Sequence, residues 1–272
     1  MIDNSEKIIS VITINLNDKL GLQRTVESVK SQSNSLYEHI IIDGGSTDGS
    51  LDLIKENASL FSYSISESDK GVYDAQNKGI AKAKGAYLIF LNSGDTFCSS
   101  KVLDLFVNDP HAKKYSVVYG NSNIIKGNGA IEKLIPPDEL STNFWYRQTL
   151  NHQAVFFKRD VFERFGKYNT NYRFSADMDL LLMIFKKEPE AFYHLNEFVC
   201  NYVEAGLSAK PENYEVIIKE KEQILKTYLS SEEYKRAKEN YLNELPYKTR
   251  LRIFVSERPL LKSLTSLLFS KK

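Results

Sequence analysis

The sequence predicts an α/β protein in which a Rossmann-like sheet, mixed but mainly parallel, is flanked by helices. Three observations predict this class. Apolar runs of strand length alternate with segments of helical period through the first third of the chain, which favours parallel strands with helices on both faces. Polar loops rich in Gly, Asn and Asp follow several of these runs. After Gly206 the pattern becomes helical, which predicts a C-terminal helical extension.

The first elements are predicted in the order strand, helix, strand, helix. Residues 8–16 (IISVITINL) are rich in β-branched side chains, as in a buried strand. Apolar residues then recur at helical spacing over 22–29. Residues 39–42 form the second strand, which leads through a Gly-rich turn into a helix that contains Leu51 and Ile54.

A third strand over 62–66, a helix over 72–84 and a strongly apolar strand over 87–91 complete this region. Gly85 is expected to be the C-cap of the helix, because glycine readily adopts the left-handed conformation that ends many helices.

Beyond residue 116 the predicted elements are mixed in type. They are strands over 117–120 and 154–158, a helix over 177–187, an extended segment over 192–203, and helices over 212–228 and 231–245. Ser230 and Ser231 suit the N-cap of the last helix. We expect one domain over 1–208 and the helical extension over 209–272.

The bulk composition excludes some classes of protein. A formal net charge of +1 over 272 residues gives no field that would favour nucleic acid as a partner. Cys98 and Cys200 lie in apolar surroundings without metal-ligand spacing, so we expect buried free thiols and no disulfide. No basic segment followed by a long apolar run opens the sequence, and no run is long enough to cross a membrane. We therefore expect a cytoplasmic protein.

The segment 246–272 differs from the rest in composition. Its seven Lys and Arg residues stand against one acid, Glu257, and are interleaved with Leu, Ile, Phe and Val. This balance favours peripheral contact with anionic lipid at the inner face of the cytoplasmic membrane. A packing or dimerising helix pair explains the composition equally well.

Ligands of parallel sheets bind outside the carboxyl ends of the strands. Three loops follow predicted strand ends: Asn15–Asn17, Asp43–Gly49 and Asn92–Asp95. In the second loop the glycines allow close backbone approach, Ser46 or Thr47 can cap the next helix, and Asp43 can accept a hydrogen bond from a base or ribose. A capped turn without a ligand is the simpler alternative. The spacing does not match GxGxxG, which counts against a dehydrogenase.

In the third loop, Asp95 follows a buried apolar strand. One carboxylate at such a strand end can hold Mg²⁺ or Mn²⁺ while diphosphate oxygens and water complete the shell. A lone Asp in a turn is otherwise a turn former.

Acids and a histidine in the second half are further candidates. Asp177 and Asp179 begin a predicted helix, where acids complement the helix dipole, and one of them could remove a proton from an acceptor. His152 and Gln153 precede a predicted strand, where a structural hydrogen bond is the simpler role for the histidine. The aromatic stretch 144–147 could line a sugar pocket or pack in the core.

These motifs, in this order, resemble the family 2 glycosyltransferases of the GT-A fold. The resemblance covers roughly residues 9–208 and rests on five segments: ISVITINLN, IIIDGGSTDGS, SESDKGVYDAQNKGIAKAKGAYLIFLNSGD, NHQAVFF and SADMDLLL. DKGVYDAQNKG and LNSGD are most similar to the branch that includes colanic-acid-type and other polysaccharide-building transferases.

The resemblance implies a role for each matched residue. Asp95 matches the last acid of the metal motif, while Asn92 and Gly94 stand where acids are common. Asp177 matches the general base, and Gly44 replaces the second acid of the nucleotide-recognition turn. The donor-binding residues are expected to be Asn15, Asn17, Asp43, Ser46, Asp69, Asp74, Asn77, Asn92 and Ser93. On the acceptor or diphosphate side they are His152, Gln153, Asp179, Gly206 and Ser208.

The resemblance implies an inverting, metal-dependent transferase that moves a sugar from a nucleotide-diphosphate donor to a glycan or lipid-linked acceptor in polysaccharide assembly. Two alternatives come from other classes. A metal-dependent nucleotidyltransferase would release pyrophosphate from a nucleoside triphosphate. A catalytically silent nucleotide-sugar-binding module, suggested by Gly44, Asn92 and Gly94, would not hydrolyse the donor.

Overall fold

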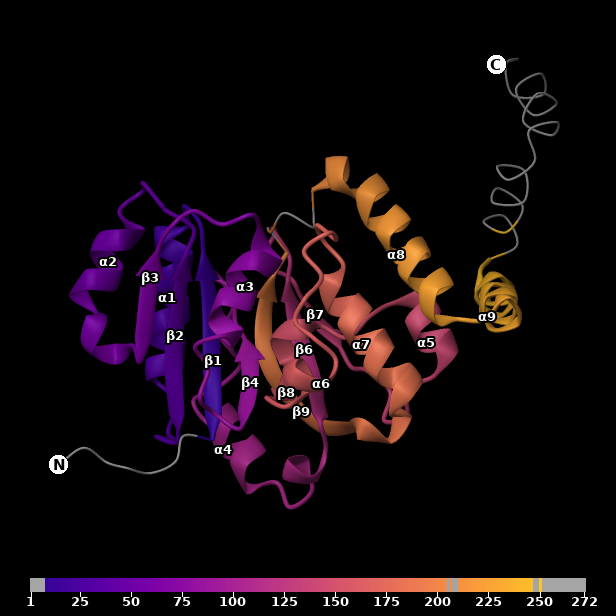
Figure 1. Cartoon of the computed structure of the whole chain (residues 1–272), viewed down its shortest axis with the longest axis horizontal. Coiled ribbons are helices and arrows are strands. Elements are labelled where there is room, and N and C mark those ends of the chain that lie inside the picture. The colour runs from indigo at the N-terminus through magenta and orange to yellow at the C-terminus, as the bar shows by residue number, and fades with distance from the viewer. Residues whose placement is uncertain (1–7, 205, 207–209, 247–249, 251–272) are drawn as a thin grey trace, which may run out of the picture. The chain divides into compact units, whose positions relative to one another are not determined.

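The computed structural model describes residues 8–204, 206, 210–246 and 250 (Figure 1). Its contacts divide the chain into two compact units. One unit runs to Leu140 and resumes from Thr149 to Ile224; the other combines Ser141–Gln148 with the chain from Leu225 on. The expected domain boundary between residues 208 and 209 stays a prediction.

The strands join one sheet in the order β3-β2-β1-β4-β8-β6-β9-β5, with β7 paired to β6. Four strands form its parallel half: β1 (Ile9–Asn15), β2 (Tyr37–Asp43), β3 (Tyr63–Ser66) and β4 (Tyr87–Phe90). The pattern of residues 8–91 predicts all four strands correctly to within two residues at their ends.

The second half of the sheet is mixed. Its strands are β5 (Thr96–Phe97), β6 (Val117–Ile125), β7 (Ile131–Leu134), β8 (Val155–Lys158) and β9 (Phe192–Val203). β8 is antiparallel to both β4 and β6, whereas β6 and β9 run parallel. The antiparallel pair of β4 and β8 therefore joins the two halves.

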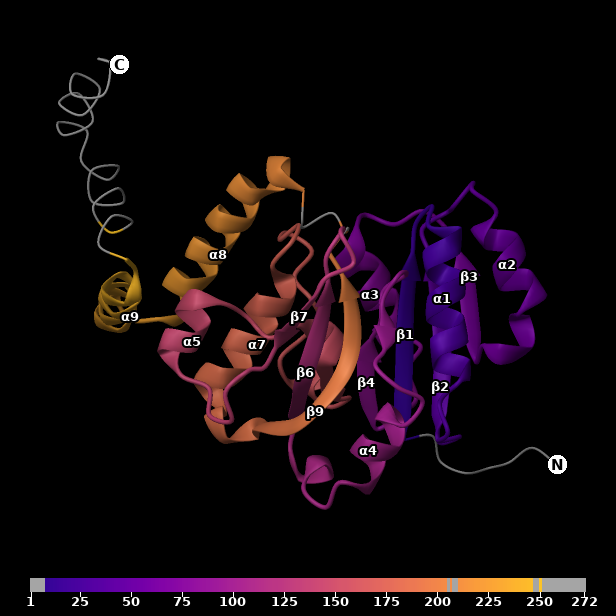
Figure 2. The ribbon, with the colours of Figure 1, turned by 180° about the vertical axis from the view of Figure 1, so that it is seen from behind.

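Helices cover both faces of this sheet. The α-helices of the first unit are α1 (Lys19–Lys30), α2 (Ser50–Glu56), α3 (Val72–Ile80), α4 (Val102–Asn108), α6 (Val161–Arg164) and α7 (Ala176–Lys187). Figure 1 shows α3 and α7 in front of the strands, and Figure 2, from behind, shows α1 and α4 in front. Val29 of α1 and Phe106 of α4 share a core cluster with Ile9 and Val11 of β1.

The remaining helices lie late in the chain or in the second unit. They are α5 (Thr142–Arg147), α8 (Tyr214–Tyr228) and α9 (Ser231–Glu244). Short 3₁₀ helices span Ala58–Leu60, Ala112–Lys114, His152–Ala154, Pro189–Ala191 and Pro211–Asn213. The predicted N-cap of the last helix is confirmed, since Ser230 and Glu233 form a reciprocal capping box.

The predicted end of α3 is wrong. The helix ends at Ile80, with Ala81 as its C-cap, and Gly85 does not cap it. Gly85 instead lies against β1, where its backbone N–H donates to Ser10 Oγ at 2.9 Å. A Cβ added there would lie 2.6 Å from the Ser10 nitrogen, so this position requires glycine because the two backbones approach closely.

No helix in the described part of the chain is long and apolar enough to cross a membrane. Both cysteines are free thiols; Cys200 is buried as expected, whereas Cys98 is only partly buried. Most of the basic segment 246–272 lies outside the described residues, so its lipid-binding role stays a prediction.

Candidate active site

The loops after β1, β2 and β4 meet at one edge of the sheet, and Asn15 links them. Its Nδ2 donates to Asp43 Oδ1 at 2.7 Å and to Ser46 Oγ at 3.1 Å. Its Oδ1 accepts from Ser93 Oγ at 2.7 Å. Because Asn15 is only 4% exposed, its amide serves mainly to fix the three loops in one arrangement.

Asp43 organises the turn after β2. Its side chain is fully buried, and its oxygens accept from Asn15, the Ser46 hydroxyl, the Ser66 hydroxyl and two backbone N–H groups. Burial by itself would raise the pKa of this carboxyl, but these hydrogen bonds outweigh it and lower the pKa. The carboxylate is thus ionised and already engaged by the protein.

The expected capping of the next helix by Ser46 or Thr47 is wrong. Gly49 is the N-cap of α2 at φ 91°, and no side chain caps that helix. The Ser46 hydroxyl contacts Asp43 instead, and it accepts from the Asn17 backbone N–H at 2.8 Å. Asn17 itself adopts φ 53°, a left-handed conformation that Asn tolerates better than most residues.

Gly44 makes room for a carboxylate from another loop. A Cβ added at position 44 would lie 2.5 Å from Asp69 Oδ2. The other oxygen, Oδ1, accepts from the Gly71 backbone N–H at 2.8 Å, just before α3. Asp69 therefore places its charge where a side chain on residue 44 would begin.

Gly94, like Gly44, has a carboxylate from another part of the chain beside it. Asp18 caps α1 by accepting from the Gly21 backbone N–H at 2.9 Å. Its second oxygen lies 3.5 Å from where a Cβ on Gly94 would be. No pattern in the sequence selects Asp18, because its position depends on how α1 packs against the loop after β4, where Thr25 Oγ1 accepts from the Gly94 backbone N–H and donates to the Asp95 carbonyl.

Asp95 is 4% exposed, and each of its oxygens already accepts one hydrogen bond. Gln153 Nε2 donates to Oδ2 at 3.0 Å, and the Val203 backbone N–H donates to Oδ1 at 3.2 Å. Burial raises the pKa of Asp95 to about 6, although the bonds from Gln153 and Val203 act in the opposite direction.

The residues around Asp95 fit a divalent cation only if a bound ligand supplies further oxygen ligands. The described residues contain no group of three or more His, Cys, Asp or Glu side chains that could enclose a metal. A single carboxylate suits Mg²⁺ or Mn²⁺ only when a ligand supplies further oxygens, such as those of a diphosphate. The choice of Asp95 as metal ligand stays a prediction.

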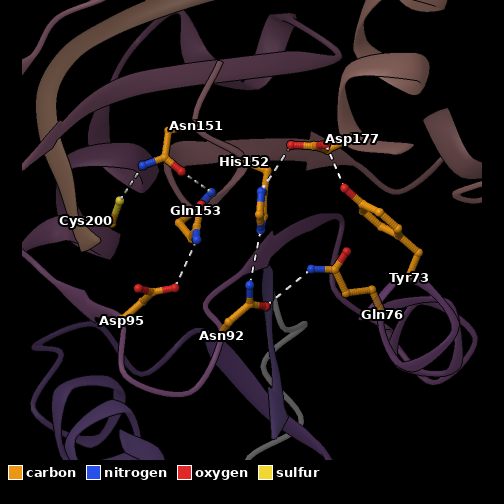
Figure 3. A network of polar contacts seen from close by, with 9 residues as sticks. All are labelled: Tyr73, Gln76, Asn92, Asp95, Asn151, His152, Gln153, Asp177 and Cys200. Atoms are coloured by element: carbon orange, nitrogen blue, oxygen red, sulfur yellow. Dashed lines mark hydrogen bonds and ion pairs between the residues drawn. The ribbon is translucent and has the colours of Figure 1, made fainter. Parts of the chain in front are cut away.

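Asp177 lies in the first turn of α7 and is 7% exposed. Tyr73 Oη of α3 donates to its Oδ1 at 2.8 Å, and His152 Nδ1 lies 3.2 Å from its Oδ2 (Figure 3). Burial would raise the pKa of this carboxyl, but the hydrogen bonds that it accepts from His152 and from the Tyr73 hydroxyl lower it. Asp177 is therefore ionised near neutral pH.

His152 and Gln153 connect the two predicted acids. They are adjacent in the 3₁₀ turn before β8. His152 contacts Asp177, while Gln153 donates to Asp95 (Figure 3). One turn thus holds the carboxylate of the loop after β4 and the carboxylate of α7, although the two acids are far apart in the sequence.

The contacts of this network come from a face of α3 that does not include Asp74 and Asn77, whose expected contact with the donor stays a prediction. Asp74 accepts from the Lys70 backbone N–H at 3.0 Å, and Asn77 exchanges two hydrogen bonds with the backbone of Tyr168. The residues that join the network are Tyr73 and Gln76, one position earlier in each case. Gln76 lies three residues after Tyr73 and four before Ile80, so helical spacing places it on their face of α3. This spacing is the signal in the sequence that could have identified it.

The other predicted residues are less engaged in this network. Asp179 is buried two residues beyond Asp177 and takes no part in the contacts of Figure 3. Gly206 is exposed, and Ser208 lies outside the described residues. Their expected place on the acceptor or diphosphate side stays a prediction.

Comparison with known proteins identifies relatives over most of the chain. A family model described as glycosyl transferase family 2 matches residues 10–176. An uncharacterised glycosyltransferase of Mycobacterium tuberculosis is 37% identical over 181 residues, covering 65% of this chain and 69% of the relative. A PGL/p-HBAD biosynthesis glycosyltransferase of Mycobacterium bovis is 30% identical over 209 residues, covering 72% and 77%.

Solved structures share the fold at low sequence identity. Residues 1–349 of Staphylococcus aureus TarS, in complex with UDP-GlcNAc, match with a TM-score of 0.61 and 15% identity, over 94% of this chain and 86% of that one. The mannosyltransferase PcManGT of Pyrobaculum calidifontis, in complex with GDP-Man and Mn²⁺, matches with a TM-score of 0.53 and 13% identity, over 99% and 89%. The expected GT-A fold is thereby confirmed.

Proposed function

We propose that this chain, which belongs to glycosyl transferase family 2, is an inverting enzyme that uses a nucleotide-diphosphate sugar. The observation that carries the proposal is the turn at His152 and Gln153, which holds both Asp95 and Asp177. A donor-side acid and an acceptor-side base must lie near one another for a single displacement. The likeness to structures bound to UDP-GlcNAc and GDP-Man supports a nucleotide-sugar donor.

The donor lies at the edge formed by the loops after β1, β2 and β4. Asn15 and Asp43 keep those loops in register, and the Asp69 carboxylate beside Gly44 is the acid best placed to accept hydrogen bonds from the base or ribose. Asp95 would hold Mn²⁺ or Mg²⁺, and a cation there would supply positive charge to offset the charge that develops on the departing diphosphate.

Asp177 accepts the proton of the acceptor hydroxyl. As that oxygen forms a bond to the anomeric carbon, the bond from this carbon to the diphosphate oxygen breaks, so the configuration inverts. The lowered pKa of Asp177 keeps it ionised, and each of its oxygens retains a lone pair beyond the hydrogen bond that it accepts.

Replacing Asp177 by Asn tests the base. The amide keeps the shape of the side chain but cannot take a proton, so turnover should fall by about two to four orders of magnitude while donor affinity is retained. Asp52→Asn, on the exposed side of α2, is the matched control and should match the wild type. Near-normal turnover of Asp177→Asn would refute the assignment.

The donor is tested by thermal shift with UDP-, GDP- and dTDP-sugars in the presence of Mn²⁺, because a ligand that binds only the folded state raises its melting temperature. We expect one nucleotide class to stabilise the protein, and its sugar to be hydrolysed or transferred. Binding without any turnover would favour a silent module, and pyrophosphate release from a nucleoside triphosphate would favour a nucleotidyltransferase.

The acceptor in this proposal is a glycan or lipid-linked sugar of a polysaccharide pathway. The basic composition of 246–272 supports a site of action at the inner face of the cytoplasmic membrane. Contact with that surface would bring the enzyme to an acceptor that is anchored in lipid.

A further inference from the structure

Four side chains form a single hydrogen-bonded row that ends at Asp177 (Figure 3). Gln76 Nε2 donates to Asn92 Oδ1 at 3.3 Å, Asn92 Nδ2 lies 3.3 Å from His152 Nε2, and His152 Nδ1 lies 3.2 Å from Asp177 Oδ2. The row crosses from α3 to the loop after β4, then to the turn before β8, and finally to α7.

The direction of every bond in this row follows from its last member. An ionised carboxylate can only accept, so the proton of the His152 ring must be on Nδ1. In the neutral ring Nε2 then accepts from the Asn92 amide. The Asn92 carbonyl is left to accept from Gln76, which is fully buried. The row therefore fixes both the tautomer and the orientation of the ring.

Because the row is buried, each of its hydrogen bonds is costly to lose. The side chains of His152 and Asp177 are only 16% and 11% exposed, so little water is available to replace a lost hydrogen bond. Tyr73 restrains one carboxylate oxygen and His152 the other. If the bond to His152 is lost, only the hydrogen bond from Tyr73 restrains the carboxylate, which can then turn about its Cβ–Cγ bond.

We infer that His152 is a positioning residue for Asp177, acting through its Nδ1 bond to the carboxylate, and that Asn92 holds the ring in place for that purpose. The inference rests on the proposed function, since it presumes that Asp177 is the base. It assigns His152 to neither donor nor acceptor binding. His152 instead sets the direction of the lone pair that receives the acceptor's proton.

Three substitutions separate the two ring nitrogens. In His152→Asn the new side-chain amide would reach the position of Nδ1, and in His152→Gln it would reach the position of Nε2, because the two side chains differ by one carbon. His152→Asn therefore keeps the bond to Asp177 and loses the one to Asn92. His152→Gln keeps the contact with Asn92 alone, and His152→Ala loses both.

We expect His152→Ala and His152→Gln to lower kcat by about ten- to a hundredfold, the usual effect of a misplaced reacting group. His152→Asn should retain kcat within about threefold of the wild type. Donor affinity by calorimetry should change little in all three variants, because the inference gives His152 no contact with the donor. The double variant His152→Ala with Asp177→Asn should be no slower than Asp177→Asn alone, because the histidine acts through that carboxylate.

Four outcomes would overturn the inference. Equal losses in His152→Asn and His152→Ala would mean that Nε2 itself meets the substrate. A further loss in the double variant would mean that His152 acts independently of Asp177. Unchanged kcat in His152→Ala, beside an impaired Asp177→Asn, would leave the proposed function standing and remove this role. Full activity of Asp177→Asn would instead refute the proposed base, and the role of His152 with it.

Discussion

Two acids lie beside glycines of the strand-end loops, and only one of them, Asp69, is among the expected donor-binding residues. Asp69 fills the space beside Gly44, and Asp18 lies beside Gly94. In each case a glycine stands where the family resemblance implies an acid, and a carboxylate from another part of the chain lies in the adjacent space. The sequence of each loop therefore contains fewer acids than this edge of the sheet has, because Asp69 and Asp18 reach it only when the chain is folded.

Asp69→Asn tests whether this displaced carboxylate contacts the donor. The amide retains an oxygen that can accept from the Gly71 N–H, so the start of α3 should be preserved. Loss of the charged acceptor should weaken donor binding by about tenfold, as expected for a hydrogen bond to a charged group. Calorimetry with the nucleotide measures it, and Asp52→Asn is the control. Unchanged affinity would assign Asp69 a purely structural role.

The pKa of Asp95 predicts a pH dependence of stability. Burial raises it to about 6, above the value of about 3.9 in an unfolded chain. The folded state thus binds this proton more tightly, so the contribution of Asp95 to stability is fully present below pH ~4 and is lost as the pH rises through about 6. Replacement by Asn removes that dependence.

In EDTA, the melting temperature of Asp95→Asn relative to the wild type should therefore rise between about pH 4 and pH 7. The new amide can still accept from the Val203 N–H, and Gln153 can turn its own amide to match. Differential scanning calorimetry across this range checks the prediction. Parallel curves for the two proteins would show that Asp95 titrates normally.

At the scale of elements, the parallel half of the sheet was predictable because its signals are local. β1, β2 and β4 each contain an apolar run followed by polar loop residues, whereas β3 alternates apolar and polar residues. The ends were less predictable. α3 stops at Ile80 rather than at Gly85 because the backbone of β1 approaches Gly85, and no pattern within α3 contains that information.

The site was predicted at the level of loops more accurately than at the level of side chains. The three strand-end loops do meet, as parallel topology requires. On α3, the residues that join the network are Tyr73 and Gln76, which are not among the predicted site residues, whereas the expected donor contacts of Asp74 and Asn77 stay predictions. A shift of one residue turns a helix by about 100°, so the face that meets the site depends on how α3 packs against the sheet.

That packing can be tested at Gly79. A Cβ at this position would collide with the Cγ2 atom of Ile12 in β1. Gly79→Ala should destabilise the protein by about 1–3 kcal/mol through overpacking, despite the better helix propensity of Ala. Gly127→Ala, in an exposed turn with no atom within 4 Å, is the control. Urea unfolding gives both values, and a more stable Gly79→Ala would contradict the close packing.

At the scale of the whole molecule, the two halves of the sheet supply different parts of the site. The parallel half brings together the loops at which we place the donor. The mixed half brings the turn before β8 and the start of α7, which carry His152, Gln153 and Asp177. The two halves meet where β4 pairs with β8, so residues from distant parts of the chain converge on the loop that follows β4.

The basic composition of segment 246–272 predicts contact with an anionic membrane surface. Each Lys or Arg near an anionic surface contributes about 1 kcal/mol. Replacing Arg250, Arg252, Arg258 and Lys262 by Gln in the full chain should therefore lower binding to phosphatidylserine vesicles at least about tenfold. The control replaces Lys113, Lys114, Lys235 and Arg236, which are exposed elsewhere, and changes net charge equally. Sedimentation with vesicles at low and high salt measures binding, which should weaken as salt screens the charges. Equal losses in both variants would show that net charge alone drives binding, and no binding by the wild type would favour a packing or dimerising role for the segment.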